Sequence, residues 1–243
     1  MKRAHKSARR GFFWFAAVTG VIAFAAVVLL SSDLLVIREF EIVGNHEVAV
    51  DDILLASGIS LRQNILSFSP RAAQNSIENL PFVRSALVLR DYPDRVVISV
   101  SERMPIAYTR FFNTYLLLDN HGMVLDVSAT AARGLPVVVG LDITSFAVGE
   151  YLDLANLRIF DCIILLSGAF ARHNFDLAQM VDISNPAQIR IIADGIIINF
   201  GSTDDSDRKI QDIAAIIQAM PSDVRGQIHI SDPALPPRFE PLR

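Results

Sequence analysis

Residues 11–32 limit the folding of this chain more than any other feature. The run GFFWFAAVTGVIAFAAVVLLSS has 22 residues and no charged side chain, and as a helix it would extend about 33 Å, enough to cross the hydrocarbon core of a bilayer. Residues 1–10 carry five basic side chains and no acid, so we expect a cytoplasmic tail, a transmembrane anchor and a body across the membrane. A signal peptide cleaved near Ala23-Phe24-Ala25 is the main alternative, but the apolar run exceeds the ~7–15 residues usual for one.

The charge of the remaining chain disfavours some classes of function. Outside residues 1–10 there are 17 basic and 26 acidic side chains, and an acidic body binds nucleic acid poorly. Hydrophobic residues make up 51% of the chain, which predicts folded domains rather than disorder. Cys162 is the single cysteine, and this excludes an intramolecular disulfide framework and a multi-cysteine zinc site.

The segment 36–103 predicts a compact unit with the order strand, helix, helix, strand, strand. Gly58 is typical of a helix end, and Ser69-Pro70 is typical of a helix start, with serine as the cap. Alternating apolar and acidic residues before Gly44 predict a strand. The expected elements are a strand from 36 that ends at Gly44-Asn45, helices at 50–57 and 69–80, and strands at 83–90 and 95–102.

Beyond Ala107 the pattern predicts further strands and two helices. Asp194-Gly195 is a favoured pair for a tight hairpin turn and divides the strand pair expected within 188–201. A helix follows, with Ser206 as its expected cap and Pro221 as its stop. The other expected elements are strand runs within 116–127, a helix within 154–172, a strand at 180–184 and a final strand at 224–231, followed by a tail in which Pro233, Pro236 and Pro237 restrict pairing to an edge with gaps.

The motifs of the first unit resemble those of one known domain. They are VGNHEV at 43–48, Gly58-Ile59, Asn64-Ile65 and LPFVRSALVLRDYPDRVVISVSERMPIA at 80–107. In this order, after a basic tail and an apolar span, they resemble a POTRA domain of the kind found in the bacterial cell-division protein family FtsQ, called DivIB in some bacteria. The later hairpin and helix are similar to the second domain of that family.

The resemblance implies an α+β architecture with a single N-terminal transmembrane helix. A POTRA domain with the order β-α-α-β-β and a second α+β domain with a mostly antiparallel sheet would follow. The expected divisions are a cytoplasmic basic tail at 1–10, a transmembrane helix at 11–32, a POTRA domain at 36–104, a β-rich second domain at 105–232 and a C-terminal tail at 233–243.

The resemblance also implies a function and partners. It indicates a non-enzymatic, single-pass scaffold at the division septum, in the cytoplasmic membrane, that binds membrane-anchored proteins of the FtsB and FtsL type through a sheet edge. A partner strand would satisfy the unpaired amides and carbonyls of that edge. The alternative is a POTRA-containing component of outer-membrane protein assembly or secretion, which needs several hundred more residues of strands, whereas 136 residues follow Ala107.

We place the predicted partner site at the carboxyl end of the second domain. Ile228 and Ile230 lie on the expected final strand, and Phe239 and Leu242 in the tail would cover a partner strand. The family usually has an Ile-Asp-Leu-Arg-like string here, whereas this chain has Ile228-His229-Ile230-Ser231 and lacks the charges on which such a contact would depend. The alternative is that Phe239 packs onto its own sheet.

No pattern in the sequence predicts catalysis, a cofactor, a metal site or a small-molecule substrate. The five histidines lack metal-ligand spacing, and Cys162 lies in an apolar helical stretch where a thiol behaves as a small hydrophobe. The acids at 204, 205 and 207 fit the positive end of a helix dipole. Glu102, Arg103 and Pro105 mark the expected domain junction, where we expect the charged pair to fix the angle between the domains.

Overall fold

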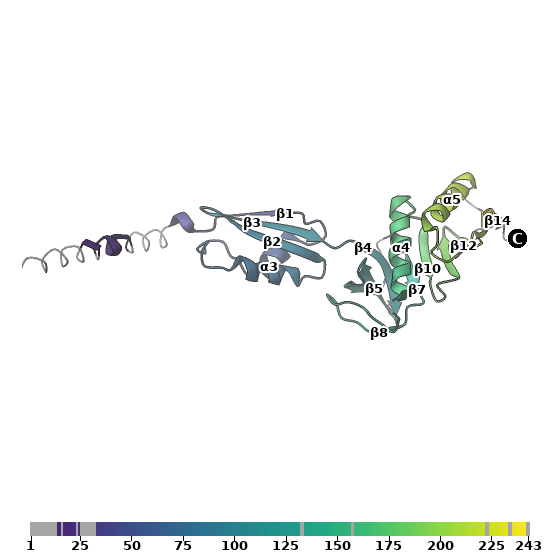
Figure 1. The fold of residues 1–243 in the computed structure, drawn as a ribbon, viewed down its shortest axis with the longest axis horizontal. Coiled ribbons are helices and arrows are strands. Elements are labelled where there is room, and N and C mark those ends of the chain that lie inside the picture. The colour runs from purple at the N-terminus through teal and green to yellow at the C-terminus, as the bar shows by residue number, and fades with distance from the viewer. Residues whose placement is uncertain are drawn as a thin grey trace, which may run out of the picture. The chain divides into compact units, whose positions relative to one another are not determined.

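A computed structural model describes residues 14–15, 17–22, 24, 33–131, 134–156, 158–221, 224–232 and 235–241. The chain divides into two compact units between Glu102 and Arg103, and Figure 1 shows the elements of each. No helix among the described residues combines the length and apolar character that a membrane crossing requires. The basic tail at 1–10 lies outside the described residues, as does most of the predicted transmembrane helix at 11–32, and both stay predictions.

The first unit is a three-stranded sheet packed against two helices. After a short 3-10 turn η1 (Asp33–Leu35), its elements are β1 (Glu39–Val43), α2 (Val50–Ser57), α3 (Pro70–Glu78), β2 (Val83–Asp91) and β3 (Arg95–Glu102). The sheet order is β1-β3-β2, with β1 parallel and β2 antiparallel to β3. The predicted order of strand, helix, helix, strand, strand is therefore confirmed.

Local sequence sets the ends of these helices. The Ser69 hydroxyl accepts a hydrogen bond from the Ala72 amide at 3.3 Å, and Pro70 occupies the first helical position. Gly58 ends α2 in the left-handed conformation with φ 66°. Both predicted signals are confirmed. The core of the unit joins Ile53 of α2 and Ile77 of α3 to the inward-facing residues of the sheet.

The second unit contains a nine-stranded sheet with the order β14-β13-β12-β11-β10-β7-β4-β5-β6. Five of its eight strand pairings are antiparallel and three are parallel, so the mostly antiparallel sheet is confirmed. Its strands are β4 (Pro105–Phe111), β5 (Thr114–Asp119), β6 (Val124–Ser128), β7 (Val137–Val139), β10 (Ala178–Asp182), β11 (Ile189–Ala193), β12 (Ile196–Gly201), β13 (Gly226–His229) and β14 (Arg238–Pro241). A separate pair is formed by β8 (Ile143–Ser145) and β9 (Asp153–Leu154).

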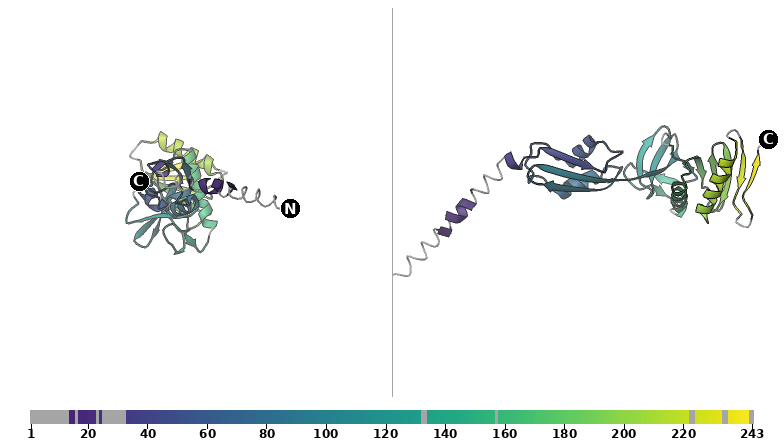
Figure 2. Two further views of the ribbon diagram at one scale, coloured as in Figure 1. Left: turned by 90° about the vertical axis from the view of Figure 1, so that its left-hand side faces the viewer. Right: turned by 90° about the horizontal axis from the view of Figure 1, so that it is seen from above.

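Two helices, α4 (Arg158–Arg172) and α5 (Ser206–Ala219), pack beside each other against the large sheet. Figure 1 shows α4 running along the strands, and Figure 2 shows the same elements from two further sides. Their buried residues include Phe160, Leu166 and Ile210, which share one core with the strands. The core of the second unit therefore lies between this helical layer and one face of the sheet.

Three expectations for the second unit need correction. The helix expected from Leu154 to Arg172 begins only at Arg158, because Leu154 belongs to β9 and pairs with Ile143 of β8. Ser206 is not the cap of α5. Asp205 holds that position with φ 54°, while the Ser206 hydroxyl donates to the carbonyl of Thr203. The predicted hairpin turn is confirmed, since Asp194 and Gly195 both have positive φ, 48° and 79°.

The third correction concerns the carboxyl end. The strand expected at 224–231 is β13, and it is not the final strand, because the predicted tail contains β14 paired antiparallel to it. Pro236 and Pro237 precede β14 rather than interrupt it, and Pro241 is its last residue. The missing proline amides therefore fall outside the strand or at its end.

Lys209 fixes the start of α5 to the end of β12. Its side chain is buried, and its Nζ donates to the carbonyls of Phe200 at 3.2 Å and Ser202 at 2.8 Å. The ammonium also lies 4.8 Å from the centre of the Phe200 ring. Burial lowers the pKa of Lys209, against the opposing effect of nearby Asp204 and Asp205.

Candidate protein-binding edge of the second domain

Among the described residues, β14 has one neighbouring strand, because it ends the order of the nine-stranded sheet. Its partner is β13, with Phe239 opposite Ile228 and Arg238 opposite His229. In an antiparallel pair, alternate residues direct their amide and carbonyl groups away from the partner strand. The outer side of β14 is therefore an edge at which another extended segment can form main-chain hydrogen bonds.

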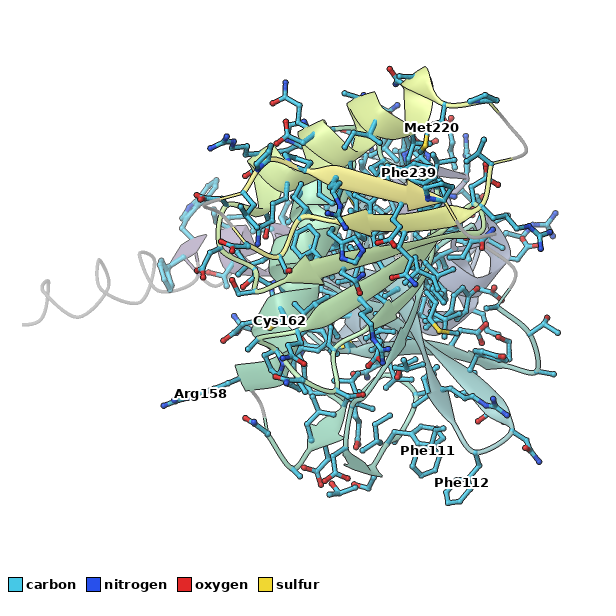
Figure 3. All side chains as sticks on the ribbon, turned by 90° about the vertical axis from the view of Figure 1, so that its right-hand side faces the viewer. Phe111, Phe112, Arg158, Cys162, Met220 and Phe239 are labelled. Atoms are coloured by element: carbon cyan, nitrogen blue, oxygen red, sulfur yellow. The ribbon has the colours of Figure 1, made fainter. Side chains whose placement is uncertain are left out.

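Phe239 anchors β14 to the inner face of the sheet. The side chain is half-buried and packs against the core of the unit. A methyl group added at Gly226 would lie 2.4 Å from two ring atoms of Phe239, so the ring fills the space above this glycine. Figure 3 shows Phe239 on one outer strand of the domain and Phe111 and Phe112 on the opposite side.

Polar side chains form a row on the other face of the sheet. The cross-strand registers place them opposite one another on neighbouring strands. The row consists of Asp182, Arg190, Asn199, His229 and Arg238. The row therefore ends at the free edge of the sheet with a basic residue, Arg238.

Contacts along this row hold its side chains in place. Arg190 pairs with Asp182 at 2.8 Å, and the Asn199 amide lies 3.3 Å from Nδ1 of His229. The pKa of Asp182 is lowered, chiefly by hydrogen bonds from Ser184, which outweigh its burial, with a further contribution from Arg190. The row therefore carries a mixed polar surface rather than an apolar one.

Opposite charges flank Phe239 at the edge itself. Arg238 and Glu240 are exposed and point to the face opposite Phe239, and Arg238 Nη2 lies 3.4 Å from Glu240 Oε2. His229 Nε2 lies 3.6 Å from the same carboxylate. A segment paired to β14 would meet a base, an aromatic ring and an acid in alternation.

The four residues predicted to bind a partner occupy different environments. Ile228 and Ile230 are buried, with 0% and 6% of their surface exposed, and both belong to the core of the domain. Phe239 lies on the edge strand, and Leu242 lies outside the described residues. Partner binding by these residues stays a prediction, and Phe239 is the one placed at the free edge.

The predicted junction residues have separate partners. The Glu102 carboxylate accepts hydrogen bonds from the amides of His46, Glu47 and Val48, each at 2.9 Å. Arg103 instead donates to Asp119 at 3.0 Å, and these side chains are only 12% and 1% exposed. Pro105 begins β4 opposite Asp119. Each of the two charged side chains thus binds groups of its own unit. A role for the pair in setting the angle between the domains stays a prediction.

Sequence reasoning missed Arg238 and Glu240 as edge residues. Their alternation with Phe239 was a signal for a short strand, but the surrounding prolines favoured a tail. It also missed Asp119 and Lys209, whose partners are distant in sequence or are backbone carbonyls.

The thiol of Cys162 is buried, and burial together with Asp161 raises its pKa. Among the described residues, no three His, Cys, Asp or Glu side chains gather as they would around a metal ion.

Comparison with known proteins identifies the first unit. The family description "POTRA domain, FtsQ-type" matches residues 35–103. The resemblance to FtsQ and DivIB is confirmed. The POTRA domain of this chain is thus of the FtsQ type, with the β-α-α-β-β order described above.

Curated relatives extend the similarity into the second unit. FtsQ of Koribacter versatilis is 28% identical over 176 residues, which cover 69% of this chain and 49% of that protein. FtsQ of Syntrophotalea carbinolica is 31% identical over 149 residues, covering 59% and 52%, and DivIB of Clostridium tetani is 25% identical over 183 residues, covering 74% and 69%. The chain spans about half the length of the two FtsQ relatives. All three relatives are cell-division proteins.

Proposed function

We propose that this chain is a non-enzymatic membrane scaffold of the bacterial division machinery. It crosses the cytoplasmic membrane once through residues 11–32, with its amino terminus in the cytoplasm and both folded units on the other side. At the septum it binds small membrane-anchored proteins of the FtsB and FtsL type. The similarity to FtsQ and DivIB supports the role in division, and the charge pattern of residues 1–32 supports the orientation.

The free edge of β14 is the observation that carries the proposed binding mode. A partner strand added there extends the nine-stranded sheet and satisfies the outward-facing backbone groups of β14. On the core-facing side, its apolar side chain covers Phe239, while on the polar face it pairs an acid with Arg238 and a base with Glu240. Backbone pairing provides affinity, and the alternation of base, aromatic ring and acid provides specificity.

A binding measurement with a matched phenylalanine control tests this proposal. The full chain, or its Phe239→Ala variant, is titrated with the extracytoplasmic segments of the small partners. We expect the variant to weaken capture by at least ~1 kcal/mol, because aromatic anchors contribute strongly to interfaces. Phe112→Ala is the control, since Phe112 is 81% exposed at the β4–β5 turn, away from β14.

Thermal melts of the same variants separate binding from folding. If Phe239→Ala lowers the melting temperature while its folded fraction binds with unchanged affinity, Phe239 serves only its own core and the partner edge lies elsewhere.

A reporter active only outside the cytoplasm, fused after Arg243, tests the orientation. A mature amino terminus near Ala26 would contradict the uncleaved anchor.

A further inference from the structure

The POTRA sheet has a face that neither of its helices covers. Side chains alternate along each strand, and the inward set, including Val88, Val96 and Ile98, is buried with α2 and α3. The opposite set defines the outer face. It consists of Glu39, Glu41 and Val43 on β1, Arg95, Val97 and Ser99 on β3, and Leu87, Leu89 and Asp91 on β2.

Four of these residues form an aliphatic patch, namely Val43, Leu87, Leu89 and Val97. Leu89 lies directly opposite Val97, and Leu87 and Val43 lie opposite Ser99 from its two sides. Val43, Leu87 and Leu89 are 44%, 48% and 50% exposed. Solvent-facing positions of a sheet are usually polar where one of its faces is open to water, and apolar side chains that gather at such positions are typical of an interaction surface.

One end of the outer face is acidic. The register places Glu39 and Asp91 on either side of Arg95. Arg95 donates to Asp91 at 2.7 Å and to Glu41 at 3.0 Å. Three carboxylates thus surround one guanidinium, which contacts two of them, and the net negative charge favours a partner with Lys or Arg at this end.

The width of the patch fits a helix, and the β2 edge beside it is closed to an added strand. The patch spans three strands, about 10 Å at the usual strand spacing, and this matches the ~10 Å diameter of a helix. The edge of β2 is blocked at Ala86, whose carbonyl accepts from Gln74 at 2.9 Å and whose amide donates to Glu78 at 3.0 Å. Side chains of α3 therefore occupy backbone groups that an added strand would need.

We propose that the outer face of the POTRA sheet docks an amphipathic helix of another protein. The apolar stripe of that helix covers the aliphatic patch, and its Lys or Arg side chain meets the acidic end near Glu39. The helix completes a third layer on the sheet, opposite α2 and α3. A second copy of this chain would bring like charges together. The surface lies on a different sheet from β14 and does not depend on strand addition there.

Site-specific photo-crosslinking of the full chain in growing cells tests the proposal. A photoreactive amino acid replaces Leu89 and, as a matched control, Leu55, which is 82% exposed on α2. Mass spectrometry identifies the cross-linked peptide, and Glu39→Lys is introduced beside the Leu89 probe. Immunoblots confirm that all variants accumulate equally.

We expect Leu89, and not Leu55, to give one dominant adduct with a peptide of helical apolar periodicity that carries Lys or Arg. Glu39→Lys should lower its yield about fivefold, the effect of reversing one surface charge contact. The proposal is overturned by an adduct with a second copy of this chain, with lipid or with a peptide lacking a basic residue. It is equally overturned by no adduct, or by a yield that Glu39→Lys leaves unchanged.

Discussion

A single carboxylate holds three backbone amides in the POTRA domain. Glu102, at the end of β3, accepts from His46, Glu47 and Val48, which lie in the loop between β1 and α2. Burial acts to raise the pKa of Glu102, but the three amide hydrogen bonds outweigh it and hold the pKa below its ordinary value. The ionised carboxylate therefore stabilises this loop.

Glu102→Gln should lower the stability of the POTRA domain by about 1–2 kcal/mol at pH 7, because a neutral amide replaces a charged acceptor. Since the native pKa is lowered, the contribution of Glu102 is full above its ordinary carboxyl pKa of 4.5. It is lost as the pH falls through the lower native value. Urea unfolding at pH 7 and in acid should show that the gap in free energy of unfolding between wild type and variant narrows in acid. Glu39→Gln, at an exposed acid of β1, is the control, and a gap independent of pH would contradict this role.

At the scale of elements, the attachment of β14 depends on a glycine in β13. Gly226→Ala would place a methyl group 2.4 Å from the Phe239 ring and 2.5 Å from the Glu240 carbonyl oxygen. The carbonyl is backbone and cannot move without shifting β14, so we expect a loss of about 1–3 kcal/mol. Hydrogen exchange should accelerate at the amides that join β13 to β14.

The matched control is Gly168→Ala in α4. There the added methyl group meets only the flexible end of the Arg172 side chain, at 3.1 Å. In a helix interior, alanine is also more favourable than glycine. This variant should be neutral or slightly more stable. Unchanged exchange in Gly226→Ala would show that Phe239 does not hold β14 in the way described.

The elements that sequence predicted well have local signals. The Ser69 cap, the Gly58 helix end and the Asp194-Gly195 turn are determined by residues within a few positions of one another. The strand β14 has four residues, follows two prolines and ends on a third, and it depends on pairing with β13 and on the Phe239 ring above Gly226. The alternative that Phe239 packs onto its own sheet could be stated from sequence, but only the register shows which face its ring covers.

At the scale of the whole molecule, the two charged side chains at the boundary between the units bind partners in different units. Glu102 binds amides of the first unit, and Arg103 pairs with the buried Asp119 carboxylate of the second. Each unit has its own hydrophobic core. We therefore expect the two units to unfold as separate cooperative transitions.

Two fragments divided at this boundary test that independence. Residues 33–102 and 103–243 should each unfold in one cooperative transition, and the sum of their curves should reproduce that of residues 33–243. The first fragment is small, but its twelve buried apolar residues form a continuous cluster, and domains of this size do fold alone. Within 33–243, Arg103→Met should lower only the transition of the second unit, by about 2 kcal/mol, because it removes the 3.0 Å ion pair of the buried Asp119 carboxylate and leaves two amide donors, with His121 Nδ1 at 3.9 Å. Glu102→Gln should lower only that of the first. A non-cooperative melt of 33–102, or equal shifts of both transitions in either variant, would mean that the two units unfold as one.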